Sequence, residues 1–535
     1  MFKSIFIKEY LKLKWSFFFL FLAEFMVLVH FTFNLYFSFS SIEPESMMWY
    51  QWIQLQQKPY FYLSYFYVAI GVIIASIQFL LEMIKNRIKI SVHLPLAMRT
   101  VMGFHLLCGW FFVITLTTFF SMALFNIIGY YYPNDVLIVT LKDSLAYSFA
   151  SIVSYTIMAS VLVEKNRKKQ FFKALLLILF IFLFIKEEYS RIDFFWILIF
   201  IIAPFLLLDS FYSIKQQRLK KGFQPLMILV FLTQLGLVYS YYVQHYKKEF
   251  NRYYIFYSPL LNDFVYQKNF GNHQFEYGVK HKTTFTQKEY QSTLPFVYWK
   301  DLDIQNQLPI TIHGKVFEKE TIKESRLSFN YTPKMLKPLE IELYPLFNPK
   351  KNEGVIPFSE EFFTITKQKA NVYDYDQKRN KLEDDLNLHL KENHFHFPAK
   401  KIWGKTTNLK PFDLGYLILD AQNSLFHLKR ANDTLFVKKI PYPNYIELAY
   451  INLSENRQKR LSGYAIDMQN NFYLLDWGFN FIKLKLSFFN HTTMKLKLLA
   501  DPLYYFIQYD DGTNYYAELY SKQTYEKIDE IKFDN

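Results

Sequence analysis

Residues 60–83, YFYLSYFYVAIGVIIASIQFLLEM, decide the architecture of this protein, because Glu82 is their only charged side chain. A helix needs roughly 20 apolar residues to cross a membrane, whose hydrocarbon layer is about 30 Å thick. This stretch therefore predicts a spanning helix. Six other stretches before residue 246 approach or reach the same length: 15–39, 103–129, 145–163, 171–185, 194–214 and 225–243.

The stretch at 171–185 is the shortest of the seven, so a full crossing and a thinned, partly re-entrant segment are both open for it. With seven crossings, we expect an all-α polytopic membrane domain. A mostly β domain follows it outside the cytoplasm. The expected boundaries are 15–215 for six spans, 216–246 for the seventh spanning helix and 247–535 for the β domain.

The loops between these stretches alternate in charge. Basic residues gather before the first stretch and after the second, fourth and sixth, whereas loops 40–58 and 130–142 are poorer in bases and carry Glu43, Glu45 and Asp135. Basic loops stay in the cytoplasm. We therefore expect a bacterial inner-membrane protein with a cytoplasmic N-terminus, and an odd number of crossings places the residues after Tyr246 in the periplasm.

The two halves of the chain differ in composition. The 535 residues are 51% hydrophobic with a net charge of +14, but the apolar runs lie in the first half, and the second mixes charged and aromatic residues throughout. Because many basic residues lie in short loops between apolar stretches, the charge indicates membrane topology, and we expect no nucleic-acid partner. The single cysteine, Cys108, excludes an intrachain disulfide.

The first residues, 1–14, have the pattern of an amphipathic helix lying on the cytoplasmic membrane surface. Ile5, Phe6 and Leu11 can share one face, and Lys8 and Lys12 can stay in water.

The order of elements over about residues 1–215 resembles that of the ABC-2-type permease family. It consists of a surface helix, two spans, a basic cytoplasmic segment and four more spans. The local match is Glu82-Met-Ile-Lys-Asn-Arg87-Ile-Lys-Ile-Ser-Val-His93-Leu-Pro95-Leu-Ala-Met-Arg99. The resemblance implies that this segment contacts a separate cytoplasmic ABC ATPase. The ATPase-coupling residues would be Glu82, Arg87, Lys89, His93, Leu94, Pro95 and Arg99. It also implies a dimer, with a second copy or with another permease.

The same segment has a plainer interpretation. Ile88, Val92, Leu94 and Leu96 are apolar residues in a short loop, so they either pack against the ends of the spans or contact a partner. A basic loop alone is typical of any membrane protein.

Two polar side chains lie within the first apolar stretch. Glu24 could line a substrate path or a protomer interface, or make a hydrogen bond between helices. For His30 a simple packing role is favoured, and His105 is expected at the cytoplasmic boundary.

The second half has strand signals, and one pattern recurs. Gly415-Tyr-Leu-Ile-Leu-Asp420-Ala-Gln-Asn423 returns as Gly463-Tyr-Ala-Ile-Asp467-Met-Gln-Asn470, and more loosely around Asp510 and Asn514. Repeats near 412–440, 460–487 and 502–530 are spaced like propeller blades, although three blades do not close a ring. This half, through Lys410-Pro-Phe-Asp-Leu-Gly-Tyr416, also resembles a bacterial membrane-associated domain of unknown function.

The sequence offers no catalytic constellation. Gly404-Lys405-Thr406 approaches a phosphate-binding loop, but Ala399 occupies the position of its first glycine. We expect no enzyme activity, no cofactor and no metal site. The sequence therefore favours a transporter permease whose periplasmic domain binds substrate or a partner. The alternative is a membrane-anchored periplasmic scaffold or sensor.

Overall fold

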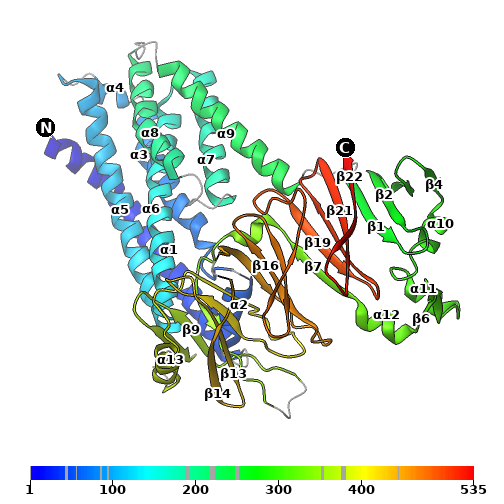
Figure 1. The fold of residues 1–535 in the computed structure, drawn as a ribbon. Coiled ribbons are helices and arrows are strands. Elements are labelled where there is room, and N and C mark those ends of the chain that lie inside the picture. Colours follow the sequence, from blue (N-terminus) through cyan, green and yellow to red (C-terminus); the bar gives the residue numbers. More distant parts are fainter. Residues whose placement is uncertain are drawn as a thin grey trace. The chain divides into compact units, whose positions relative to one another are not determined.

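The computed structural model describes residues 2–41, 46–55, 57–84, 87–92, 95–186, 193–215, 223–246, 252–350, 355–374, 381–443 and 445–534. Two compact units divide between Lys247 and Lys248. We call them the helical unit and the β unit (Figure 1).

The helical unit is a bundle of long helices joined by short connections (Figure 1). Its described helices are α1 Phe2–Ser41, α2 Ser46–Leu55, α3 Leu63–Ile84, α4 Ile88–Val92, α5 Met98–Tyr131, α6 Asn134–Val163, α7 Arg167–Lys186, α8 Asp193–Ile214 and α9 Phe223–His245. Within the described residues, six of them are long and apolar enough to cross a membrane, namely α1, α3, α5, α6, α8 and α9.

Helix α7 contains the stretch at 171–185, but its first two turns are basic. It nevertheless runs antiparallel to α8 over most of its length. Near its start, Lys173 Nζ lies 3.0 Å from Asp209 on α8, and near its end the ring of Phe184 lies 5.5 Å from that of Trp196 on α8. Helix α7 therefore spans nearly the same depth of the bundle as α8 does.

Helix α1 is continuous from Phe2 to Ser41. The amphipathic segment expected at 1–14 is thus not a separate element but the first part of a long rod. At about 1.5 Å per residue, this rod is about 60 Å long, roughly twice the thickness of a hydrocarbon layer.

Helices α3 and α6 pack through small side chains. Gly71 faces the backbone of Ser151, and a Cβ at position 71 would lie 2.1 Å from the Ser151 carbonyl oxygen. Ser64, Ala75, Ser144 and Ser151 are also buried on these two helices. Small residues let two helix backbones approach closely, which is how apolar helices associate where water supplies no driving force.

We expect Gly71→Val to destabilise the helical unit, because the added methyl groups must push α3 away from α6. Overpacking of this kind costs about 1–3 kcal/mol, which thermal unfolding in detergent would measure as a lower Tm. Gly103→Val on α5 is the matched control, since no atom lies within 4 Å of its added Cβ. Equal Tm values for the two variants would contradict the close α3–α6 contact.

The β unit consists mainly of antiparallel sheets (Figure 1). They are β1 Arg252–Ser258, β2 Asp263–Gly271, β3 Gln274–Val279 and β4 Thr283–Phe285; β10 Ala370–Asp374, β9 Glu361–Ile365 and β8 Tyr344–Pro345; β11 Lys401–Gly404, β12 Tyr416–Leu419, β13 Leu425–Ala431 and β14 Thr434–Ile440; β15 Leu448–Leu453, β16 Leu461–Asp467, β17 Phe472–Asp476 and β18 Phe481–Leu484; and β22 Lys527–Asp534, β21 Asn514–Ser521, β20 Tyr504–Asp510, β19 Lys495–Ala500 and β7 Leu327–Tyr331. A small hairpin pairs β5 Ile310–Ile312 with β6 Lys315–Phe317.

Short helices connect or cover these sheets. They are α10 Gln287–Ser292, α11 Trp299–Ile304, α12 Lys319–Ser325, the 3-10 turn η2 Pro333–Leu336 and α13 Lys381–Glu392. Helix α13 is rich in charged residues, and its Leu386 and Leu390 are fully buried.

The five larger sheets share hydrophobic cores in an open row. One core joins β1–β4 to β19–β22, the next joins β19–β22 to β15–β18, another joins β15–β18 to β11–β14, and the last joins β11–β14 to β8–β10 and α13. The free face of the first sheet packs against Tyr290 of α10. The described strands form no closed propeller, because among them no core joins the first sheet of the row to the last.

The recurring sequence pattern forms the hairpin turns of this row. Asp420 Oδ1 accepts hydrogen bonds from the backbone N–H groups of Gln422 and Ser424, and Asp467 Oδ1 does the same for Gln469 and Asn471. Asn423 and Asn470 take positive φ values of 60° and 68°, which asparagine tolerates better than most residues. The repeated Asp and Asn are therefore turn residues.

Candidate functional site

The segment expected to contact an ATPase lies between α3 and α5. Arg87, Lys89, Pro95 and Arg99 are all exposed, and the short helix α4 carries Lys89. His93 and Leu94 lie outside the described residues. We call residues 87–99 the coupling segment.

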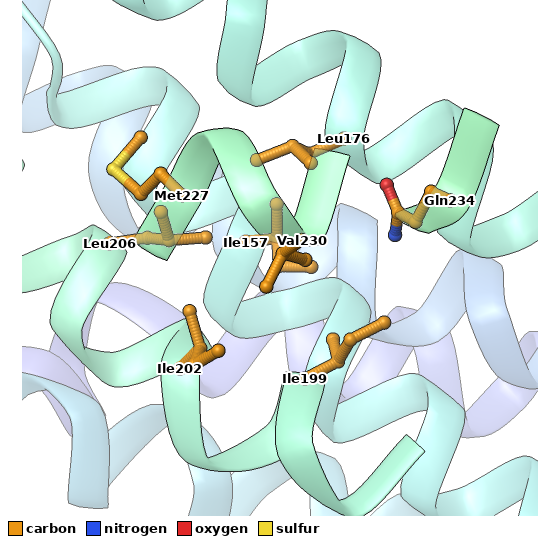
Figure 2. A pocket seen from close by; sticks show the side chains of 8 residues that line it. All are labelled: Ile157, Leu176, Ile199, Ile202, Leu206, Met227, Val230 and Gln234. Atoms are coloured by element: carbon orange, nitrogen blue, oxygen red, sulfur yellow. The ribbon is translucent and has the colours of Figure 1, made fainter. Parts of the chain in front are cut away.

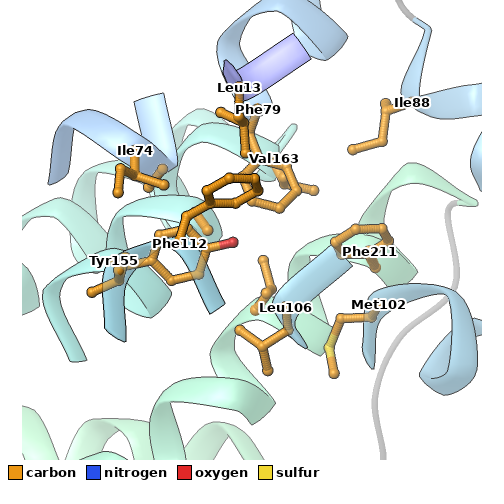
Figure 3. Close-up of a cluster of buried hydrophobic side chains, with 14 of the residues drawn as sticks. Leu13, Ile74, Phe79, Ile88, Met102, Leu106, Phe112, Tyr155, Val163 and Phe211 are labelled. Carbon is orange, nitrogen blue, oxygen red and sulfur yellow. The ribbon is translucent and has the colours of Figure 1, made fainter. Parts of the chain in front are cut away.

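Ile88 attaches the coupling segment to the interior of the bundle. Its side chain is 3% exposed and belongs to a hydrophobic cluster with residues of α1, α3, α5, α6 and α8. Figure 3 shows Ile88 together with Leu13, Ile74, Phe79, Met102, Leu106, Phe112, Tyr155, Val163 and Phe211. Leu96 packs against the same cluster, while Ile90 is 71% exposed. One face of α4 is therefore anchored, and the other is open.

Glu82 has a different position from the rest of the predicted set, because it is buried and ion-paired. Lys8 and Lys12 of α1 place their ammonium groups 2.9 and 3.2 Å from Glu82 Oε1. Lys8 is exposed, as expected, whereas Lys12 is largely buried, and both connect α1 to the end of α3.

Glu9, which sequence reasoning missed, completes this network. It is fully buried, with Lys12 Nζ at 2.7 Å and His105 Nδ1 at 3.3 Å. His105 was expected at the boundary of the membrane but is buried. The spacing of Glu9 and Lys12, three residues apart on one helix, was the available signal. We call Lys8, Glu9, Lys12, Glu82 and His105 the first ion network.

A second ion network joins α6, α7 and α8. Lys173 is completely buried, and its Nζ lies 2.8 Å from Glu164 and 3.0 Å from Asp209. It also donates to Ser210 Oγ at 2.7 Å. Lys169 pairs with the other oxygen of Asp209 at 3.0 Å. Burying charges is costly unless their partners are close, so these contacts hold α7 against α6 and α8.

The two intramembrane polar residues named from the sequence lie on different faces of α1. Glu24 is completely buried. His30 is exposed, and its Nε2 lies 3.0 Å from Asn34 Nδ2 one turn away. His30 thus makes a local contact within its own helix.

A small apolar cavity lies among α6, α7, α8 and α9. Figure 2 shows its lining, which consists of Ile157, Leu176, Ile199, Ile202, Leu206, Met227, Val230 and Gln234. Its volume is about 10 Å³, which is room for about one water molecule. This cavity therefore cannot hold a transported substrate in the conformation described.

In the β unit, the distinctive motif 410–416 forms a buried clamp between two sheets. Lys410 binds Asp413 and, at 3.1 Å, Glu455 Oε1. Glu455 also accepts from the backbone N–H of Leu414 at 2.8 Å. Burial raises the pKa of the Glu455 carboxyl, although Lys410 opposes that shift. The clamp connects the loop before β12 to the loop after β15, so the motif holds neighbouring sheets together.

We expect Lys410→Met to destabilise the β unit strongly, because it leaves Asp413 and Glu455 buried without a cation. Breaking a buried ion pair costs about 3–5 kcal/mol, which thermal unfolding followed by tryptophan fluorescence would detect. Lys459→Met, at an exposed lysine that lies over the Phe412 ring, is the control and should change little. Restoration of stability by the triple variant K410M/D413N/E455Q would assign the loss to unpaired charge. An unchanged K410M would contradict the clamp.

The described residues contain no group of three or more His, Cys, Asp or Glu side chains that could hold a metal ion. His394 lies in the turn after α13 with a φ of 59°, and His396 follows it in irregular backbone.

These features define a class of protein with six apolar helices of spanning length, among the residues described, followed by a mostly β unit. Residues 254–518 match the family described as a domain of unknown function (DUF4857). This match lies within the β unit and includes the clamp and the repeated turns. No curated protein and no solved structure matches the chain.

Proposed function

We propose that this chain is the membrane permease subunit of an ABC-2-type, ATP-driven transporter, and that a separate cytoplasmic ATPase binds the coupling segment. One observation carries the proposal: α4 is anchored by Ile88 and exposes Lys89 and Ile90 on its other side. We infer that this exposed face, with its apolar and basic side chains, is where the ATPase binds.

Because Ile88 anchors α4 in the bundle interior, a displacement of α4 can be transmitted to other helices. Ile88 shares its hydrophobic cluster with Phe79 of α3 and Phe211 of α8. Close-packed interiors transmit displacement because they contain few voids. A push on α4 by an ATPase that closes on ATP would therefore move α3 and α8 together, and with them the two ion networks.

The β unit is proposed to lie in the periplasm, where it would bind substrate or a partner. The support is that α7 runs beside α8 over most of its length. If α7 therefore crosses the membrane with α8, seven helices cross in total, and the two ends of the chain lie on opposite sides. Two copies, or one copy and a second permease, would complete the transport pathway.

The ATPase contact can be tested by charge reversal. We expect K89E/R99E to reduce co-purification with an ABC-type ATPase encoded beside the gene by about tenfold, a change equal to roughly 1.4 kcal/mol of binding free energy. Lys165→Glu is the matched control, because Lys165 is also basic, exposed and located in a loop on the same end of the bundle. Equal recovery of the ATPase with all three chains would contradict the proposed contact.

The side of the β unit can be tested by cysteine labelling, since Cys108 is buried. We expect Gln523→Cys, at an exposed turn of the β unit, to react with a membrane-impermeant maleimide added outside intact spheroplasts. Lys165→Cys should react only after lysis. If both sites reacted only after lysis, Lys165 and the β unit would lie together in the cytoplasm, and an even number of helices would cross.

A second candidate is a membrane-anchored periplasmic scaffold or sensor without transport activity. The observation that favours it is the small volume of the cavity among α6–α9, about 10 Å³. Failure to recover any ATPase with the wild-type chain, together with a periplasmic β unit, would support this candidate over the transporter.

A further inference from the structure

Glu24 stands apart from the other buried carboxylates of the helical unit. Its side chain is completely buried, and within the described residues neither carboxyl oxygen has a hydrogen-bond partner or a cation. Glu9 and Glu164, by contrast, each lie within 3 Å of a lysine ammonium. An isolated ionised carboxylate in a low-dielectric interior is too costly to persist, so such a group takes up a proton.

Neighbouring contacts locate Glu24 along the bundle. Helices α1 and α3 are antiparallel, with Lys12 donating to the Gln78 carbonyl at 2.8 Å and the ring of Phe31 lying 6.2 Å from that of Tyr62. Glu24 lies between these two contacts, at about the level of Tyr67. On α5, the rings of Phe21 and Phe119 are 4.5 Å apart, which brings the turn containing Ser121 to the same level.

A row of hydroxyl groups begins at this level. Tyr67 Oη lies 2.8 Å from Ser121 Oγ, and Ser121 Oγ lies 3.5 Å from Ser148 Oγ on α6. The hydroxyls of Ser64 and Ser144 are also buried, and both lack partners among the described residues. Hydroxyl groups donate and accept hydrogen bonds but carry no charge, so this row supplies no counter-ion for Glu24.

No charged group of the neighbouring helices is positioned to neutralise Glu24. The facing titratable side chains are the phenols of Tyr67 on α3 and Tyr147 on α6, whose rings are 5.7 Å apart. On α1, Glu9 lies fifteen residues earlier, which is about 22 Å along a helix, and His105 of α5 lies beside Glu9.

Toward the other end of the bundle, Asp143 of α6 is already paired. Lys58 Nζ lies 2.8 Å from its carboxylate, and Tyr60 Oη donates to it at 2.7 Å. The described residues of helices α3 and α5, which pack against α1, therefore supply no cation to Glu24.

We propose that Glu24 is a proton-binding site inside the helical unit, protonated while α1 packs against α3 and α5. When these helices separate and water reaches the carboxyl, its O–H bond breaks, the electron pair stays on the carboxylate, and the proton passes to that water. Packing of α1 thus takes up one proton. By linkage, a rise in pH favours separation, and separation releases the proton. The site does not depend on the proposed ATPase.

Infrared difference spectroscopy of the full chain in lipid nanodiscs tests this proposal. We expect the wild-type spectrum minus that of Glu24→Gln to show the C=O stretch of a protonated carboxylic acid at pH 7, and this band to disappear in alkaline buffer. Glu24→Asp, which keeps the acid, should shift the band and provides a second readout if the glutamine variant does not fold. A carboxylate signal for Glu24 at pH 7 would overturn the proposal.

The pH dependence of Tm gives an independent check. The wild-type Tm should fall relative to that of E24Q as pH rises above neutral, because only the wild type must lose a proton. Glu164→Gln is the matched control: it removes a paired carboxylate, so it should lower the Tm at pH 7 and leave the protonated-acid band intact. Parallel pH profiles for wild type and E24Q would contradict proton uptake on packing.

Discussion

The ammonium group of Lys173, buried between Glu164 and Asp209, is the interaction on which the arrangement of the helical unit depends. Helix α7 has too many basic residues to enter an apolar layer on its own composition. The two carboxylates, from α6 and α8, neutralise the buried charge and so hold α7 along the length of α8. In the proposed topology, this contact determines whether the number of crossings is odd, and therefore on which side of the membrane the β unit lies.

The same constraint, that a buried charge needs a partner, organises the C-terminal end of α3. Glu82 and Glu9 share Lys8 and Lys12, and His105 completes the group. The coupling segment begins a few residues after Glu82, and Ile88 is packed in the cluster just beyond it. The coupling segment, the proposed site of ATPase binding, is thus joined to an interior whose charges are paired. Glu24 is the exception because it has no such partner. The proposed protonation removes the charge that would otherwise be buried without a cation.

In the β unit, the main constraint is the burial of apolar sheet surfaces. Successive sheets share hydrophobic cores in an open row, and α10 packs against the free face of the first sheet. The Lys410–Asp413–Glu455 clamp and the repeated Asp–Asn turns maintain the spacing of this row. The family match covers most of this row.

Hydropathy alone determined that the first half forms apolar helices and the second forms strands, because both depend on the local order of residues. The Asp and Asn of the repeats indicated hairpins for the same reason. The tertiary structure decided what depends on distant segments: that Glu82 is buried rather than exposed, that Glu9 is paired and Glu24 is not, and that the blade-like repeats form an open row. Two carboxylates on one helix look alike in sequence, but helix rotation and register determine which of them meets a cation.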